Sequence, residues 1–401
     1  MEPFRSPDQR RLYDNSYPVV EDSKLSYEKL QKYQLANHQP ENEVEITLSN
    51  PLIKDSLLKY VVYSINGKDK TGTFEAYRRY KDFEALRTLL IRHWPGCVIP
   101  KIPPKQTLGN LEGDFIEQRR KLLEAFLVRV ANTSYLHQSE EFHMFLRGPN
   151  EYHKAIANFR RPTYDQLAAT YQSIFPSFAE FQVTDSIQKE LEEAFKYFQQ
   201  GQITLEIFHG KSKMCVDYFG YYKNELFGMF QGLKGINSQY LESKNEIQFD
   251  LLESKENPYG ELLDWIRVEI LDMGGMVEAF KKKKEYERIK EKIAERIDEE
   301  RKKLLNLQLD KKTVMQILVR KPKEYYTDKI SKTIQDLETE LRSINTINNI
   351  IAGRLMQIEI PRFRKSKTVV YESVIRNLTS SSSNQLEFII AQTRKVEESL
   401  N

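Results

Sequence analysis

The sequence predicts an α+β domain with a small antiparallel three-stranded sheet plus helices, followed by an all-α region of three long helices. Between residues 44 and 79, short runs alternate apolar and polar side chains, as the strands of a half-buried sheet do. Beyond residue 183, prolines are few, and apolar residues recur at helical spacing with hardly a break. These two patterns place the change of fold class near the middle of the chain.

The strands are predicted from alternation and turn residues. Val44, Ile46 and Leu48 alternate with polar residues, which predicts a strand. Residues 60–65 (YVVYSI) predict a second strand, and the Asn66-Gly67 pair that follows is a strong signal for a hairpin turn. A third strand is predicted over residues 71–79, closing the sheet.

The helices of this first domain follow from apolar spacing. Helices are predicted over residues 81–93, 114–130 and 140–146. The proline-rich stretch 95–106 between the first two must be a loop, because proline lacks the N–H that a helix or a central strand needs. Gly148-Pro149 ends the unit, so the predicted domain covers residues 41–150, after a disordered tail over 1–40.

The second half is predicted to be a linker followed by a bundle. Residues 151–182 form the linker, with an amphipathic segment over 164–181 that Pro176 interrupts. Long helices are predicted over 183–253, 259–309 and 322–400, in a region of residues 183–401. Helices of this length cannot bury their apolar stripes in a small globule, so a self-associating coiled coil is expected.

Two features disturb these long helices. Gly201 and Gly210, with four further glycines, fall inside the first, where each costs up to about 1 kcal/mol relative to alanine. Either the helix breaks near Gly201 and Gly210, or the glycines allow a close approach of another helix. Pro361 should kink the last helix, because it removes one hydrogen bond and its ring crowds the preceding turn.

Composition narrows the class of protein. The 401 residues carry a net charge of only +3, with 40% hydrophobic and 30% charged residues, which argues against a largely disordered chain. Apolar runs stay below the roughly 20 residues of a spanning helix, and the N-terminal stretch is polar, without the pattern of a signal peptide. Cys97 and Cys215 lie far apart, which fits a reducing, cytosolic compartment.

Three segments carry a resemblance to a known family. They are Arg78-Arg79-Tyr80-Lys81-Asp82-Phe83, the loop Pro100-Lys101-Ile102-Pro103-Pro104-Lys105, and Phe115-Ile116-Glu117-Gln118-Arg119-Arg120. In this order they resemble the lipid-headgroup pocket of a PX (phox-homology) domain. With the long helices behind it, the chain resembles a sorting nexin of the type that carries a C-terminal BAR domain. Residues 359–363 (EIPRF) resemble the family's acidic-x-x-Arg-Phe stretch, although Pro361 departs from it.

The resemblance implies a pocket for phosphatidylinositol 3-phosphate. Arg79 would contact the 3-phosphate, Tyr80 would support the inositol ring, Lys105 would reach the 1-phosphate, and Arg119 would bind the 4- and 5-hydroxyls. Arg78 and Arg120 are their neighbours in the predicted site. Three ordinary explanations stay open: Arg78 can serve structure, Tyr80 can be core packing, and Lys105 can be a surface charge.

Apolar and aromatic residues near the pocket are candidates for bilayer insertion. Val98 and Ile99 flank the proline loop, and they either insert or pack inside. The segment 164–181 lies in the membrane interface in the family, or else packs against one of the domains. Residues 100–103 also read as a PxxP ligand, which their place inside the domain argues against.

Basic residues in the helical half are candidates for membrane contact, since they outnumber acidic ones about two to one between Lys281 and Lys323. The predicted contact residues are Lys281, Lys282, Lys283, Lys284, Lys311, Lys312, Arg320 and Lys321. The alternatives are a solvated helix face and a nuclear localisation signal.

No enzyme is expected. The Gly210-Lys211-Ser212 run lacks the glycine that a phosphate loop needs five residues earlier, where Leu205 stands, and neither a metal motif nor a cofactor motif is visible. The expected function is endosomal sorting by a peripheral membrane protein that binds phosphatidylinositol 3-phosphate and senses or induces curvature as a BAR dimer. The alternative is a PX-anchored coiled-coil scaffold without remodelling activity.

The expected partners are phosphoinositide-containing membranes, a homo- or heterodimeric BAR-type partner, and cargo or coat proteins. Nucleic acid is not expected. The predicted location is cytoplasmic, peripheral on endosomal membranes.

Overall fold

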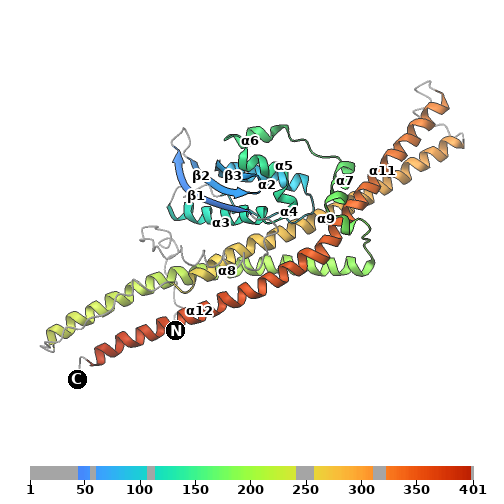
Figure 1. Ribbon diagram of the computed structural model, residues 1–401. Helices are drawn as coiled ribbons and strands as arrows, with labels where there is room; N and C mark the ends of the chain where they lie inside the picture. The colour runs from blue at the N-terminus through green and yellow to red at the C-terminus, as the bar shows by residue number, and fades with distance from the viewer. Residues whose placement is uncertain (1–43, 55–59, 106–112, 241–256, 310–321, 399–401) are drawn as a thin grey trace, which may run out of the picture.

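A small α+β unit lies against a set of long helices that extend well beyond it (Figure 1). A computed structural model describes residues 44–54, 60–105, 113–240, 257–309 and 322–398 of the chain. The predicted fold class is confirmed: a three-stranded antiparallel sheet with helices comes first, and the region that follows is almost entirely helical.

The sheet has the order β1-β2-β3, with strands Glu45–Lys54, Tyr60–Asp69 and Gly72–Arg79. The predicted turn at Asn66-Gly67 is wrong, because β2 runs through both residues to Asp69. The Phe74 ring of β3 covers Gly67, where a Cβ would collide with it. The chain turns instead at residues 70–71, where the Asp69 carboxylate accepts bonds from the Thr71 N–H (2.8 Å) and hydroxyl (2.6 Å).

Five helices complete the first unit. They are α2 (Tyr80–His93), α3 (Gly113–Ala131), α4 (Ser134–His137), α5 (Glu140–Arg147) and α6 (Tyr152–Ala155). The core centres on Phe83, whose ring meets those of Tyr63, Phe126 and Phe145 at 5.1 to 6.4 Å. Tyr152 is fully buried against Phe145. The folded unit therefore continues beyond the predicted boundary at residue 150.

The second half consists of long helices that agree with the predicted ones where the structure describes them; the predicted stretch 241–253 lies outside the described residues. The helices are α8 (Asp185–Tyr240), α9 (Gly260–Gln308), α11 (Lys323–Arg354), the π-helical turn η5 (Leu355–Glu359) and α12 (Ile360–Glu398). The helix α8 is unbroken over 56 residues despite its glycines. Gly201 allows a close approach of α9, since a Cβ there would lie 2.7 Å from the Met273 sulfur, whereas Gly210 faces open space.

Pro361 does disturb the last helix, in the turn before it. The π-helical turn of η5 ends two residues before Pro361, and α12 then continues. A π-helical turn is one of the arrangements by which a chain adapts to an interrupted hydrogen-bond ladder. Phe363, two residues later, packs its ring edge-on against Phe198 of α8 at 5.0 Å, so the disturbed turn lies beside the bundle core.

The predicted amphipathic segment packs between the two halves. It forms α7 (Tyr164–Ile174) and the short η3 (Pro176–Phe178), and Figure 1 shows α7 beside α11. Tyr171 is fully buried, stacks on Trp94 of the first unit at 6.0 Å, and donates a hydrogen bond to the Pro95 carbonyl at 2.9 Å. Of the two alternatives, packing holds in this structure.

Glycines bring the two halves into direct contact. Gly96 lies against Ile351 of α11, and a Cβ on Gly275 of α9 would lie 3.2 Å from the Ile99 carbonyl. Ile99 is buried and Val98 half-buried in this contact, so neither is free to enter a bilayer here. One apolar core runs from the sheet through α7 into the long helices.

Candidate functional site

Tyr80 joins the three sequence segments that carry the predicted pocket. It is the first residue of α2, directly after the last strand. Its hydroxyl donates a hydrogen bond to the Pro103 carbonyl in the proline loop at 2.7 Å. The guanidinium carbon of Arg119, on α3, lies 4.6 Å from the centre of its ring. The strand end, the loop and the helix therefore converge on one aromatic side chain.

Arg119 is the most unusual residue of this site. It is only 8% exposed, and its guanidinium lies between the Tyr80 ring and the Phe115 ring, 4.2 Å from the latter centre. Its Nε and Nη2 atoms are buried without an acceptor among the described residues. Burial lowers the pKa of Arg119 from its ordinary value. Because a buried charge without acceptors is costly, this arrangement is typical of a site that takes an anionic or hydroxyl-bearing ligand.

Arg79 precedes the N-terminus of α2 in an extended conformation. Its main-chain N–H donates to the Asp82 carboxylate at 3.0 Å, which holds the start of the helix. Its guanidinium is half-buried, 5.5 Å from the Tyr60 ring centre and beside the imidazole of His153. A helix N-terminus favours negative charge, and α2 is 14 residues long. A phosphate near Arg79 would therefore be stabilised by the guanidinium and by the helix N-terminus together.

Arg78 does not belong to this site. It is fully buried, and it donates hydrogen bonds to the main-chain carbonyls of Phe145 (2.9 Å), Gly148 (3.0 Å), Pro149 (3.0 Å) and Tyr77 (3.1 Å). Every nitrogen of its guanidinium is engaged in closing the C-terminal end of α5. In this structure Arg78 therefore has a structural role and is not available to bind a lipid headgroup.

Arg120 is likewise a structural residue. Its guanidinium donates to the Leu48 carbonyl of β1 at 2.6 Å and forms ion pairs with Glu117 (2.8 Å) and Glu124 (2.9 Å). These carboxylates raise the pKa of Arg120 above its ordinary value, the Glu117 hydrogen bond most of all. A side chain tied to a strand and to two acids is not available for a headgroup, so its inclusion in the site is wrong for this structure.

Lys105 remains a prediction. It is exposed and lies two residues beyond Pro103, the loop residue that Tyr80 binds. It directly precedes residues 106–112, which lie outside the described residues.

The basic run on α9 does not form one exposed face. Lys283 is buried, pairs with Glu287, and donates to the Gln188 side chain of α8 at 2.9 Å. Lys284 lies over the Phe195 ring at 4.4 Å, and Lys282 pairs with Glu285 at 2.7 Å. Lys281 is exposed. The prediction that Lys283 contacts a membrane is thus wrong in this structure. Lys311, Lys312, Arg320 and Lys321 lie outside the described residues.

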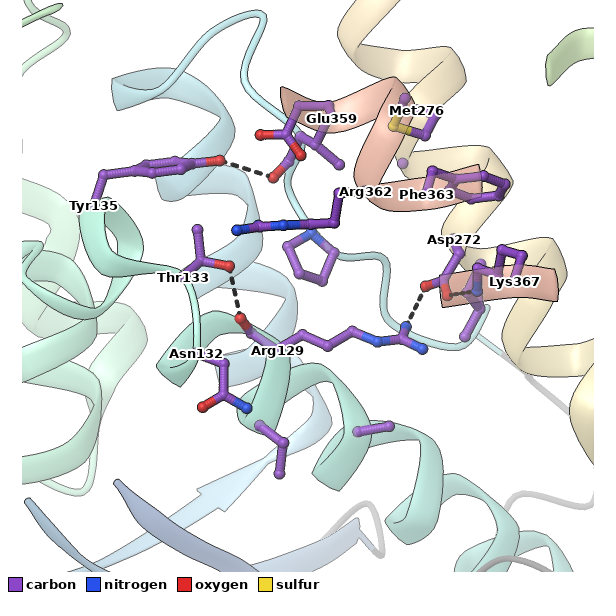
Figure 2. A pocket seen from close by; sticks show the side chains of 16 residues that line it. Arg129, Asn132, Thr133, Tyr135, Asp272, Met276, Glu359, Arg362, Phe363 and Lys367 are labelled. Carbon is purple, nitrogen blue, oxygen red and sulfur yellow. Dashed lines mark hydrogen bonds and ion pairs between the residues drawn. The ribbon is translucent and has the colours of Figure 1, made fainter. Parts of the chain in front are cut away.

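A separate cavity of about 150 Å³ lies at the seam between the first unit and the long helices, shown in Figure 2. On its rim, Asp272 of α9 pairs with both Arg129 of α3 and Lys367 of α12, and Lys367 also reaches Glu269 at 2.7 Å. Burial in this network raises the pKa of Glu269. These ion pairs connect three elements, so the cavity belongs to the docking of the two halves and not to the predicted pocket.

Sequence reasoning missed three residues at the site. Phe115 forms the second wall beside Arg119, and its spacing of four residues from Arg119 on one helix could have revealed it. Tyr60 and His153 lie beside Arg79. His153 comes after the Gly148-Pro149 stop, in a four-residue helix that apolar periodicity could not reveal.

The described residues contain no group of three or more histidine, cysteine or acidic side chains placed to hold a metal ion. None of the described helices has both the length and the apolar character needed to cross a membrane.

Comparison with known proteins supports the family resemblance. Residues 67–148 match the PX domain family model. Sorting nexin-4 of Cryptococcus neoformans is 26% identical over 208 residues, which cover 48% of this chain and 42% of that protein. The vacuolar protein sorting-associated protein vps5 of Schizosaccharomyces pombe is 35% identical over 100 residues, covering 23% of this chain and 17% of that protein. The matches thus span less than half the length of these relatives.

Among solved structures, the cryo-EM structure of the SNX-BAR Mvp1 tetramer aligns with a TM-score of 0.49 at 15% identity, covering 88% of this chain and 99% of that chain. The chain is thus similar to sorting nexins: it has a PX unit that matches the family model over residues 67–148, and a mostly helical region follows that unit.

Proposed function

We propose that the chain is a sorting nexin with a C-terminal BAR-type region, a peripheral membrane protein of endosomal sorting that binds a phosphoinositide headgroup between Arg79, Tyr80, Lys105 and Arg119. The single observation that carries the proposal is Arg119, a nearly buried cation between two aromatic rings whose Nε and Nη2 find no acceptor among the described residues. A hydroxylated ring lying on Tyr80 would supply those acceptors. The phosphate would lie at Arg79, beside the N-terminus of α2.

Phosphatidylinositol 3-phosphate is the proposed lipid. The support is the different placement of the cations: Arg79 lies at the helix N-terminus, whereas Arg119 lies deeper, against the Tyr80 ring. Arg78 and Arg120 are consumed by carbonyls and carboxylates, which leaves few cations to neutralise a second ring phosphate. A headgroup with one ring phosphate suits this count better than a bisphosphate.

Vesicle co-sedimentation tests the pocket directly. The full chain is mixed with vesicles containing phosphatidylinositol 3-phosphate, 4-phosphate or 4,5-bisphosphate, or phosphatidylserine alone. Arg79→Ala and Arg119→Ala should each weaken binding to the 3-phosphate at least tenfold, because each removes charge-assisted bonds to the ligand. Arg92→Ala is the matched control, because Arg92 is exposed on α2 and its substitution removes the same charge. Equal binding by wild type and Arg119→Ala would sink the assignment.

We propose further that the long helices associate with a second BAR-type helical region. Large apolar side chains along α8 stay exposed within the part of the chain that the structure describes: Tyr197, Ile203, Ile207, Met214, Tyr218, Tyr221, Tyr222, Met229 and Ile236. Burial of such a stripe contributes roughly 25 cal/mol per Å² of apolar surface. Size-exclusion chromatography with light scattering tests this, and a monomer at micromolar concentration would contradict it.

A second candidate function is a PX-anchored scaffold that docks on membranes without bending them. The observation that favours it is the engagement of Lys282, Lys283 and Lys284 within the protein, which weakens the case for a basic lipid-facing surface on α9. Electron microscopy of vesicles at increasing protein density separates the two functions. Tubules supply the evidence for remodelling, whereas saturated binding without tubules supports the scaffold.

A further inference from the structure

A histidine from beyond the matched PX segment lies against the arginine that is proposed to hold the phosphate. His153 belongs to α6, after the family match ends at residue 148. Its neighbour Tyr152 anchors this short helix: Tyr152 is fully buried, its ring meets Phe145 at 5.1 Å, and its hydroxyl donates to the Glu141 carbonyl at 3.1 Å. The position of His153 is therefore set by the core and not by a loose tail.

The imidazole contacts both a cation and a carboxylate. The Arg79 Nη2 atom is 3.3 Å from Nε2 and 3.5 Å from Nδ1 of His153. The Nδ1 atom is also 3.3 Å from Oδ1 of Asp82, a carboxylate that is itself buried. The neutral ring can donate from Nδ1 to Asp82 while Nε2 accepts from Arg79. The protonated ring can still pair with Asp82 but has no lone pair left for Arg79.

The other charged groups around His153 are nearly balanced. Lys81, Glu84 and Arg92 of α2 line the same open groove as His153. On α6, Lys154 pairs with Glu151 at 2.7 Å. The nearest cation is thus Arg79, and the nearest anion is Asp82. Protonation of His153 adds one positive charge at the edge of the headgroup site. Among the described residues, Asp82 is in contact with the ring, and Glu151 lies near enough to interact electrostatically with both His153 and Arg79.

We propose that His153 is a positioning residue of the headgroup site, which holds Arg79 when neutral and adds a second cation beside the phosphate when protonated, so that binding tightens as pH falls. The inference rests on the proposed function, because it needs a phosphate at Arg79. Protonation both releases the Arg79 donor from the imidazole and places an imidazolium within reach of the same anion. A basic group near an anionic lipid surface contributes about 1 kcal/mol, which corresponds to about a fivefold change in affinity.

The test compares pH profiles, because the lipid phosphate also titrates near pH 6 and loses charge as the pH falls. Binding of the full chain to vesicles with phosphatidylinositol 3-phosphate is measured between about pH 6 and pH 8, a range in which histidine changes charge. The variants are His153→Gln, which stays neutral, and His153→Lys, which stays charged. His143→Gln is the matched control, a half-buried histidine on α5 whose ring lies beside His137.

The expected result is a ratio of wild-type to His153→Gln affinity that rises about fivefold from the high to the low end of the range. The ratio of wild type to His143→Gln should stay constant, and the ratio of His153→Lys to His153→Gln should stay high across the whole range, because the lysine remains charged. A ratio to His153→Gln that does not change with pH would overturn this inference alone. Absence of wild-type binding at every pH, or binding that survives Arg119→Ala, would overturn the proposed function as well.

Discussion

Replacing Arg78 with methionine should destabilise the protein by about 4 kcal/mol without touching the headgroup site. The substitution removes the hydrogen bond that the Arg78 Nε donates to the buried carbonyl of Phe145, and an unsatisfied buried group costs about 1 to 3 kcal/mol. The carbonyls of Tyr77, Gly148 and Pro149 are partly buried, and each lost bond costs about 1 kcal/mol. Methionine retains the apolar stem, so little packing is lost.

Thermal unfolding of the full chain measures this change. At an unfolding entropy of about 2.1 cal/mol/K per residue, a chain of 401 residues shifts its midpoint by roughly 1 °C per kcal/mol, so the midpoint of Arg78→Met should fall by about 5 °C. Arg79→Met is the comparison: its guanidinium is half-buried and makes no hydrogen bond to a main-chain carbonyl among the contacts described above, so its midpoint should stay near that of wild type. Vesicle binding is then measured where circular dichroism shows both variants to be folded.

The two variants should thus differ: Arg78→Met should lose stability, and Arg79→Met should lose lipid binding. Arg78→Met should keep its affinity for phosphatidylinositol 3-phosphate per folded molecule, whereas Arg79→Met should lose most of it. An unchanged unfolding midpoint for Arg78→Met, together with lost vesicle binding, would refute the reasoning and return Arg78 to the headgroup site.

Further predictions concern packing and acid stability. Gly353→Ala places a Cβ 2.6 Å from the Phe178 ring and should lower the unfolding midpoint, since overpacking at about 1 to 3 kcal/mol exceeds the helix gain of about 1 kcal/mol. Gly210→Ala, which faces open space, should raise it; the opposite order would contradict the packing. Burial raises the pKa of Asp69, but hydrogen bonds from Arg147 and Thr71 outweigh burial and lower this pKa from 3.8 to about 2. This stabilisation is present above the ordinary value and is lost as pH falls toward 2. Urea titrations should therefore show Asp69→Asn less stable at neutral pH and less acid-sensitive than wild type, and equal acid sensitivity would count against the ion pair.

The fold could be predicted where the pattern was strong and local. Apolar spacing located α2, α3 and the long helices to within a few residues, even across the glycines of α8. The turn predicted at Asn66-Gly67 was wrong, because a contact between strands outweighs the local turn preference of these two residues. Phe74 covers Gly67, and the carboxylate of Asp69 turns the chain three residues later. Contacts between strands are not visible in the spacing of one strand.

The site could be predicted in part, for a similar reason. Residue type and order pointed to Arg79, Tyr80 and Arg119, and in the structure Tyr80 contacts both the proline loop and Arg119, with Arg79 directly before Tyr80 in the chain. Type alone could not separate them from Arg78 and Arg120, which are the same residues one position away. On a strand, successive side chains point to opposite faces, so Arg78 enters the core while Arg79 does not. For Arg120, the deciding partners lie on a strand some 70 residues earlier.

The packing of α7 between the PX domain and the long helices affects how strongly the protein binds a membrane through two contacts at once. Tyr171 on Trp94, with Gly96 against Ile351, joins the PX domain to the long helices by a packed seam in place of a flexible tether. A flexible linker would give a second membrane contact an effective concentration in the millimolar range at almost any angle. A fixed seam makes that concentration high where the lipid surface matches the angle between headgroup site and helices, and close to zero elsewhere. The protein would then select a surface by its shape even when each contact alone is weak.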